Sequence, residues 1–322
     1  MISLPDFKEK QILVVNAEWG SRPSLKFQND NIVFSKNGKV VNRASCHKVF
    51  ALFVAGDISL SSGLLKKGRE HGVSIFLAKH NFEVYAALSA FAAGNYLLRQ
   101  KQYTLSKEEE LKIAKYIVKN KIGNQFSLLK GSKLLASKEA DVAQKEIAKQ
   151  IDEVLDDQSL LGIEGNMSRR FYGMYFGEIG WLRRSPRAKQ DIPNFLMDMG
   201  YTFLFNMIDG LLSLHGFDTY KGCYHKLFFQ RKSLACDAME PFRCVIDKQI
   251  QKSYNLKQVN EKDFRIVQGK YVLDLSKNTK YAQLFAEAIM GNKEDLFTFI
   301  REYYRFVMDP ANPFPIFDIK VK

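Results

Sequence analysis

The chain has 322 residues, with 48 basic side chains against 35 acidic ones and a formal net charge of +13. This length favours two domains over a single hydrophobic core, and ordinary apolar and charged fractions of 46% and 26% exclude an intrinsically disordered chain. No apolar run approaches the roughly 18 residues of a membrane helix, and the opening segment MISLPDFKEK lacks the apolar part of a signal peptide. We therefore expect a soluble, cytoplasmic protein that has no membrane partner.

The excess of positive charge favours a polyanionic partner, because each phosphate that a lysine or arginine neutralises releases condensed counterions. Charge alone is equally compatible with a basic protein that binds no nucleic acid. The cysteines Cys46, Cys223, Cys236 and Cys244 form no Cys-x-x-Cys pair, which disfavours structural zinc and disulfides and predicts reduced thiols.

Residues 11 to about 90 are predicted to form short β-strands. These segments are rich in Val, Ile and Phe, and turn-forming residues separate them, most clearly at residues 28–31 and 36–39. A single helix is predicted over residues 59–70, where His71 and Gly72 end it. The predicted strands are residues 11–16, 24–28, 31–35, 39–42, 49–54, 73–78 and 83–88.

From Gly94 onward the spacing of apolar residues becomes helical. Ser106 and Glu109 form a capping box, and an apolar helical face from Leu111 to Ile122 follows it. This change of period is the only sign of a boundary, which we place near residue 100. We predict an α+β fold of two domains, with a small β-rich domain over residues 1–100 and a larger all-α domain over residues 101–322. The further predicted helices are residues 140–155, 160–176, 194–213, 233–254, 279–290 and 293–308.

The segment over residues 221–243, KGCYHKLFFQRKSLACDAMEPFR, has the pattern of a functional site. A helix beginning at Ser233 would place its apolar residues on one face and Asp237, Glu240 and Arg243 on the remaining arc. Pro241 has no amide to donate to the carbonyl of Asp237, so the backbone is expected to bend or open beside the two acids.

Glu164, His225 and Glu240 together form a chemically sensible metal site. Two carboxylates and an imidazole suit Mg²⁺ or Mn²⁺, and zinc would also accept them. Taken singly, Glu164 is compatible with an ordinary surface residue near a helix start, and His225 with a core histidine. The neighbouring basic residues favour phosphate chemistry, although a solvated basic face would have the same pattern. The candidates for binding DNA phosphates are Arg169, Arg170, Arg183, Arg184, Arg187, Arg231, Lys232 and Arg243.

The order of several short blocks resembles the CRISPR-associated integrase family, the universal nuclease-integrase of CRISPR adaptation. Tyr172 and Arg187 also match positions of the family pattern, and the block that contains Glu240 is the most specific part of the match. The blocks are IEG at 163–165, DIPNFL at 191–196, GY at 200–201, GFD at 216–218, GCYH at 222–225 and SLACDAMEPFR at 233–243.

This resemblance implies a β-sandwich domain, used for dimerisation and partner contacts, followed by a helical catalytic domain. It implies that Glu164, His225 and Glu240 are the catalytic metal ligands, that Asp237 is an accessory acid and that Tyr172 is a possible site tyrosine. It further implies a prokaryotic homodimer that binds double-stranded DNA, both prespacer and CRISPR repeat, and a small ferredoxin-like partner protein. The chain departs from the family pattern at Ser168, Thr219, Cys223 and Tyr224, all near the expected ligands.

The sequence is compatible with three functions. The first is an integrase whose metal activates a 3′-hydroxyl to attack a phosphodiester at a repeat boundary, exchanging one phosphodiester for another. The second is a metal-dependent endonuclease on branched or duplex DNA, in which water replaces that hydroxyl. The third is a non-catalytic DNA-binding scaffold, in which the acids only balance nearby arginines. The complete set of three expected ligands favours the first two.

Overall fold

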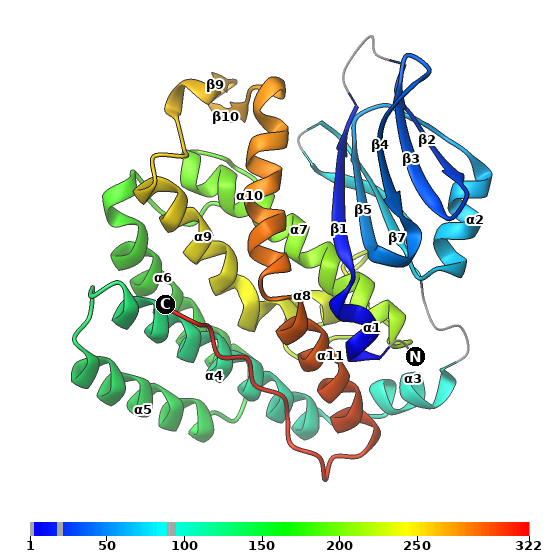
Figure 1. Cartoon of the computed structure of the whole chain (residues 1–322). Coiled ribbons are helices and arrows are strands. Elements are labelled where there is room, and N and C mark those ends of the chain that lie inside the picture. The colour runs from blue at the N-terminus through cyan, green and yellow to red at the C-terminus, as the bar shows by residue number, and fades with distance from the viewer. Residues whose placement is uncertain (1–2, 18–21, 81, 89, 91–94, 322) are drawn as a thin grey trace.

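A computed structural model describes residues 3–17, 22–80, 82–88, 90 and 95–321 (Figure 1). After a short helix α1 (Leu4–Lys8), the chain enters a mixed sheet in which β1, β5 and β7 are parallel and β8 is antiparallel to β7. A bulge at Phe50 shifts the register between β1 and β5. The strand order of this first sheet is β1 (Gln11–Asn16), β5 (Val49–Ala55), β7 (Ser74–Ala78) and β8 (Val84–Leu88).

The second sheet packs against the first and completes a β-sandwich. Its two hairpins turn at Asn29-Asp30 and Asn37-Gly38, where all four residues have positive φ, as tight two-residue hairpins require. Apolar side chains from both sheets fill the space between them, Leu25 and Leu52 among them. The strand order is β4 (Lys39–Ser45), β3 (Asn31–Lys36), β2 (Ser24–Gln28) and β6 (Ser59–Leu60).

The predicted strands of this region are confirmed, and one predicted helix boundary is wrong. Residues 59–60 pair with β2 as strand β6, so helix α2 (Ser62–Glu70) begins later than the sequence suggested. The Ser61 hydroxyl caps α2 by accepting a hydrogen bond from the backbone N–H of Leu64 at 3.2 Å.

Strand β5 is buried on both faces and joins the two regions of the chain. Its sequence VFALFVA is buried throughout, which is the pattern of a strand covered on both sides. The ring of Phe53 lies 4.7 Å from that of Phe203 in the helical region, and Phe50 packs on Phe7 at 5.2 Å. The first sheet therefore shares one continuous hydrophobic core with the helices.

The rest of the chain is mainly helical, as predicted, and no helix among the described residues is long and apolar enough to cross a membrane. The Ser106–Glu109 capping box is confirmed. One short hairpin was not predicted from the sequence: β9 (Phe264–Val267), which is largely exposed, and β10 (Lys270–Leu273), which buries Leu273. The helices are α3 (Tyr96–Tyr103), α4 (Lys107–Gly131), α5 (Ser137–Glu153), α6 (Asp157–Phe176), α7 (Ile192–Leu214), α8 (Ser233–Met239), α9 (Arg243–Asn255), α10 (Asn278–Met290) and α11 (Lys293–Met308). Short 3₁₀ turns are η1 (Cys46–Lys48), η2 (Gly177–Ile179), η3 (Glu240–Phe242), η4 (Glu261–Asp263) and η5 (Leu275–Lys277).

The helix predicted over residues 233–254 is interrupted at Pro241, as its missing amide led us to expect. Helix α8 ends at Met239, the 3₁₀ turn η3 carries Glu240 and Pro241, and α9 begins at Arg243. The N–H of Glu240 donates to the carbonyl of Asp237, an i to i−3 bond that tightens the turn. Glu240 keeps helical backbone angles, with φ −54° and ψ −46°, so the break changes the hydrogen bonding of the turn while the chain continues in a helical course.

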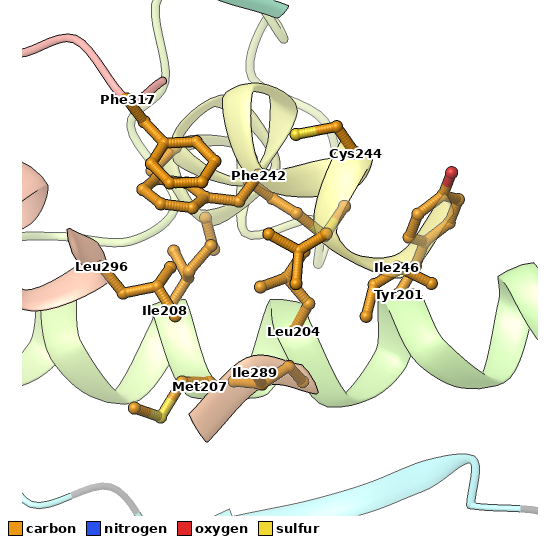
Figure 2. Close-up of a cluster of buried hydrophobic side chains, with 14 of the residues drawn as sticks. Tyr201, Leu204, Met207, Ile208, Phe242, Cys244, Ile246, Ile289, Leu296 and Phe317 are labelled. Atoms are coloured by element: carbon orange, nitrogen blue, oxygen red, sulfur yellow. The ribbon is translucent and has the colours of Figure 1, made fainter. Parts of the chain in front are cut away.

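The irregular segment after α11 is anchored over the break. Figure 2 shows Phe317 of this segment stacked on Phe242, with ring centroids 4.1 Å apart, above apolar side chains of α7. Buried amides of α4 hold its backbone: Asn120 Oδ1 accepts from the N–H of Phe317, and Asn124 Oδ1 accepts from that of Ile319, both at 2.9 Å. Asn124 also donates to the carbonyl of Pro241 at 3.0 Å, so α4 positions the turn that carries Glu240.

Replacing Phe317 by Ala is expected to lower the free energy of unfolding by about 3 kcal/mol, because a large side chain that is 3% exposed leaves a cavity behind. Ile316→Ala, at a neighbouring position that is 71% exposed, is the matched control and should change stability by less than about 0.5 kcal/mol. Denaturant unfolding of the two variants measures the difference. Equal stabilities would contradict the assigned anchoring role of Phe317.

Candidate active site

Glu240 stands at the centre of a buried charged cluster. It is 3% exposed, and its Oε2 lies 2.7 Å from Nζ of Lys121 on α4 and 3.0 Å from Nε of Arg243 at the start of α9. Burial alone would raise the pKa of Glu240, but chiefly the positive charges of Arg243 and Lys121 lower this pKa to about 2. Glu240 is therefore an ionised carboxylate at neutral pH.

Lys121 bridges the two expected glutamate ligands. Its ammonium also donates to Oε1 of Glu164 on α6, although the lysine is almost fully buried. Burial would lower the pKa of Lys121, and the two glutamates raise it above its ordinary value, so the ammonium stays charged. Lys121 was not among the site residues predicted from the sequence.

A signal for Lys121 was present in the spacing of α4. Its polar residues Asn120, Lys121, Asn124 and Gln125 are spaced one turn apart on a face that is buried among apolar neighbours. Buried polar side chains at helical spacing within an apolar helix indicate an internal polar partner.

Glu164 lies on α6, and a hydroxyl one turn later on the same helix donates a hydrogen bond to its carboxylate. Ser168 donates to Glu164 Oε1 at 2.7 Å, and Gln125 donates to the Ser168 oxygen at 3.4 Å. Burial would raise the pKa of Glu164, and the charge of Lys121 outweighs it, so the pKa lies below its ordinary value. The departure from the family pattern at Ser168 thus adds a hydrogen bond to an expected ligand.

Asp237 fixes the loop that carries His225. This aspartate is fully buried and accepts hydrogen bonds from the backbone N–H groups of Cys223, Tyr224 and His225 at 2.6, 2.9 and 2.7 Å. A side chain on Gly222 would collide with Asp237 Oδ2 at 2.8 Å, so the loop requires glycine there.

The same aspartate orients the imidazole. Asp237 Oδ1 lies 2.8 Å from Nδ1 of His225, which places the ring proton on Nδ1 and leaves Nε2 with a lone pair. Nε2 lies 3.9 Å from Glu240 Oε1, beyond hydrogen-bond distance. Asp237 therefore positions His225 through Nδ1, and the other ring nitrogen, Nε2, is the one nearer Glu240.

Two tyrosines and an aspartate lie behind the charged cluster. The Tyr172 and Tyr201 hydroxyls are 3.0 Å apart, and Tyr201 donates to Asp247 at 2.5 Å. The guanidinium of Arg243 lies 4.6 Å from the Tyr201 ring centroid. Burial, with a smaller effect of Asp247, raises the pKa of Tyr172 to about 12. Tyr172 is thus a neutral, buried residue whose hydroxyl is hydrogen-bonded to that of Tyr201, and the ring of Tyr201 packs against the guanidinium of Arg243.

The basic residues predicted to bind DNA fall into two groups. Arg169, Arg170, Arg183 and Arg187 are exposed on or after α6. The other four have partners within the chain, which gives them structural roles whatever else they contact. Arg184 pairs with Asp198 at 2.9 Å, Lys232 with Asp209 at 2.6 Å and Arg243 with Glu240, while Arg231 donates to Ser233 and to the carbonyl of Lys226.

A second group of potential metal ligands lies in the β-sandwich. Donor atoms of Cys46, His47 and His71 lie within 4.8 Å of one another, the one such group of three among residues 3–17, 22–80, 82–88, 90 and 95–321. A thiol and two imidazoles suit zinc and softer metals, and do not suit Mg²⁺ or Mn²⁺. Cysteine spacing gave no sign of this group, because its members come from η1 and from the end of α2.

The residues around Glu240 fit a divalent cation by their chemistry. The ammonium of Lys121 already lies between Glu164 and Glu240, which shows that this buried carboxylate pair accepts positive charge. The Nε2 atom of His225, whose side chain is 26% exposed, lies 3.9 Å from Oε1 of Glu240. Hard carboxylate oxygens with one imidazole are a donor set that Mg²⁺ or Mn²⁺ accepts.

Comparison with known proteins places the chain in a family. Residues 20–287 match the family model described as CRISPR associated protein Cas1. A CRISPR-associated endonuclease Cas1 from Thermodesulfovibrio yellowstonii is 27% identical over 252 residues, which cover 74% of this chain and 79% of the relative. The chain thus belongs to the Cas1 family of CRISPR-associated endonucleases and integrases. This confirms the family resemblance seen in the sequence and places the chain among the proteins of CRISPR adaptation.

Solved structures agree with the fold. A casposase bound to its integration product has a TM-score of 0.82 and 17% identity, covering 97% of this chain and 95% of the casposase. A chain of a Cas6-RT-Cas1–Cas2 complex has a TM-score of 0.76 and 21% identity, covering 97% of this chain and 36% of that one. Both similarities support the arrangement of a strand-rich N-terminal region followed by a helical region.

Proposed function

We propose that this protein is a metal-dependent DNA integrase that joins the 3′-hydroxyl ends of prespacer DNA to the boundaries of a CRISPR repeat. The observation that supports this most directly is the convergence of Glu164, His225 and Glu240. They come from α6, from the loop before α8 and from η3. Glu164 and Glu240 share Lys121, and Glu240 also lies beside His225 and Arg243. Such a site is built to handle the negative charge of a phosphodiester.

Glu164, His225 and Glu240 are the residues that would hold Mg²⁺ or Mn²⁺. When bound, such an ion polarises the phosphodiester and favours the ionised form of the attacking hydroxyl. Asp237 accepts a hydrogen bond from the Nδ1–H group of His225, so the lone pair on Nε2 stays free to bind the ion. Arg243 would supply fixed positive charge beside the reacting phosphate, whereas the ammonium of Lys121 lies where the ion would bind between Glu164 and Glu240.

The exposed arginines after the first part of α6 are the proposed contacts to the DNA backbone. Arg169, Arg170, Arg183 and Arg187 are exposed, and the chain carries a net charge of +13. We include the homodimer, the ferredoxin-like partner protein and both DNA duplexes in this proposal. The Cas1–Cas2 complex and the product-bound casposase among the structural neighbours support a protein partner and DNA binding.

The reaction is tested with a labelled DNA duplex and a plasmid that carries a CRISPR repeat. With Mg²⁺ or Mn²⁺, labelled strands should become covalently joined to the plasmid, and EDTA should abolish the joining. A duplex with 3′-dideoxy ends is the control, because it lacks the attacking hydroxyl. Joining that persists with dideoxy ends or in EDTA would refute the proposed mechanism.

The same assay separates the second candidate, a metal-dependent endonuclease, which the name of the Thermodesulfovibrio relative, an endonuclease, favours. Products that are cleaved and never joined would identify water as the nucleophile. Binding with a steep salt dependence but neither cleavage nor joining would leave the DNA-binding scaffold.

A further inference from the structure

Three side chains of the kind that binds transition metals meet at one end of the second sheet. Cys46 and His47 follow β4 in the turn η1, and His71 caps the C-terminal end of α2, yet donor atoms of all three lie within 4.8 Å of one another. The candidate active site is built from the helical region, so this group is a separate feature of the β-sandwich that the proposed function does not use.

The second sheet holds these side chains in place. The N–H of Cys46 donates to the carbonyl of Asp30, in the turn between β2 and β3, at 2.9 Å. The His71 ring stacks on Phe27 of β2, with ring centroids 5.9 Å apart and 18° between the ring planes. The rings of His47 and His71 meet edge to face at 4.7 Å. Packing already restricts these side chains, so binding a metal costs them less conformational freedom.

The donor atoms of the group are available to an ion. Cys46 is 1% exposed and its thiol is free of any disulfide. Within the part of the chain that the structure describes, no hydrogen bond involves a ring nitrogen of His47 or His71. A metal therefore displaces no protein partner from either imidazole, and the exposed position of His47 gives it a route from solvent.

The charges around the group are compatible with a bound cation. His71 lies at the C-terminal end of α2, where backbone carbonyl groups carry partial negative charge. Lys67, one turn before His71, pairs with Glu70 at 2.6 Å. Lys48, next to His47, pairs with Glu9 at 3.8 Å. Paired in this way, the two lysines oppose a nearby cation less than free ammonium groups would.

We propose that Cys46, His47 and His71 bind one Zn²⁺ ion and that water occupies its fourth position. A thiolate with two imidazoles is a zinc donor set, and binding releases the thiol proton. Donor atoms around a tetrahedral zinc ion lie roughly 3.3–3.6 Å apart, so side-chain movements of about 1 Å bring the three donors, now within 4.8 Å, onto the ion. The ion ties η1, which joins the second sheet to β5 of the first, to the end of α2, and so stabilises the β-sandwich.

The test uses the full-length chain, freed of metal with EDTA and kept reduced, with Co²⁺ as a spectroscopic substitute for Zn²⁺. The wild type should show the near-ultraviolet absorption band of a thiolate bound to Co²⁺, and Zn²⁺ should displace it. Cys46→Ser should abolish this band, and His47→Ala and His71→Ala should each weaken Co²⁺ binding by about tenfold or more. Cys236→Ser is the matched control, because Cys236 is a free thiol outside the group, and it should keep the band.

Thermal unfolding gives a second measurement. Zn²⁺ at about a hundredfold excess over its Kd should raise the unfolding temperature of the wild type by about 3 °C or more. His47→Ala should lose this rise. His225→Ala, which lacks a proposed ligand of the candidate active site, should keep it, which separates the two possible zinc sites.

A reduced wild-type chain without the thiolate band would overturn this inference. So would a band of wild-type strength and affinity in both histidine variants, or loss of the band in Cys236→Ser, because the metal would then lie elsewhere. Should Cys46→Ser fail to fold, His47→Ala still decides, since that histidine is exposed and outside the core. A thermal rise that depends on His225 and not on His47 would also refute the site.

Discussion

Glu240→Gln is expected to reduce strand joining by about 1,000-fold or more while DNA binding is retained. The variant removes the charge of a carboxylate that would bind the metal, and a bound metal supplies several kcal/mol of transition-state stabilisation. Each 1.36 kcal/mol corresponds to about a tenfold change in rate. The measurement is the initial rate of joining of labelled ends to a repeat plasmid, with DNA affinity determined in parallel at one salt concentration.

Glutamine at position 240 also leaves Lys121 and Arg243 without their shared carboxylate, so the fold itself must be checked. His225→Ala tests the same site with less effect on stability, since this side chain is partly exposed and its partner Asp237 keeps three backbone N–H donors. Glu302→Gln is the matched control, because Glu302 also pairs with two arginines, Arg301 and Arg305, away from the cluster. Normal joining by a folded Glu240→Gln and by His225→Ala would show that the chemistry occurs elsewhere.

Lys121→Met is expected to destabilise the metal-free protein and to tighten Mn²⁺ binding by at least about tenfold. Without the ammonium, Glu164 and Glu240 lose the cation that they share, and breaking such a buried pair costs about 3–5 kcal/mol. A divalent cation no longer has to displace the lysine, so Mn²⁺ should recover part of the lost stability through its binding free energy. Thermal unfolding with and without Mn²⁺, together with calorimetric titration, measures both effects without any assay of activity.

Lys119→Met provides the comparison for this prediction. Lys119 lies on the same helix and pairs with Asp152, but its partner is exposed, so the substitution should have little effect on stability or on Mn²⁺ affinity. Equal or weaker Mn²⁺ binding by Lys121→Met than by wild type would show that the lysine and the metal do not compete for the glutamates.

The division of the chain into strands and helices could be read from local patterns. The period-two strands of the first region, the capping box at Ser106 and the break at Pro241 depend on residues close together in sequence, and all are confirmed. The hairpin β9–β10 was missed because each of its strands has only four residues, and the start of α2 was misplaced because residues 59–60 pair with a distant strand.

The candidate site likewise combines residues that local sequence patterns predicted with residues that they did not. Motif blocks selected Glu164, His225 and Glu240, but the acids that hold Arg184 and Lys232 lie on α7, at distances in sequence that no local pattern relates to their partners. Lys121 and the buried hydroxyls of Tyr172 and Tyr201 could be assigned only after α4, α6 and α7 had been packed together. The proximity of His71 to Cys46 and His47 is likewise a property of the folded β-sandwich.

The sequence by itself therefore determined most of the order of secondary structure and the family, and it selected the three expected ligands, because each depends on local spacing or on residue types in a fixed order. The tertiary structure alone decided which cation neutralises these ligands, which aspartate orients His225 and which arginines are exposed. The physical reason is that electrostatic and hydrogen-bonding partners are set by distance in space, and burial makes those few contacts strong. Lys121, 43 residues before Glu164 and bound to it in the core, is the clearest case.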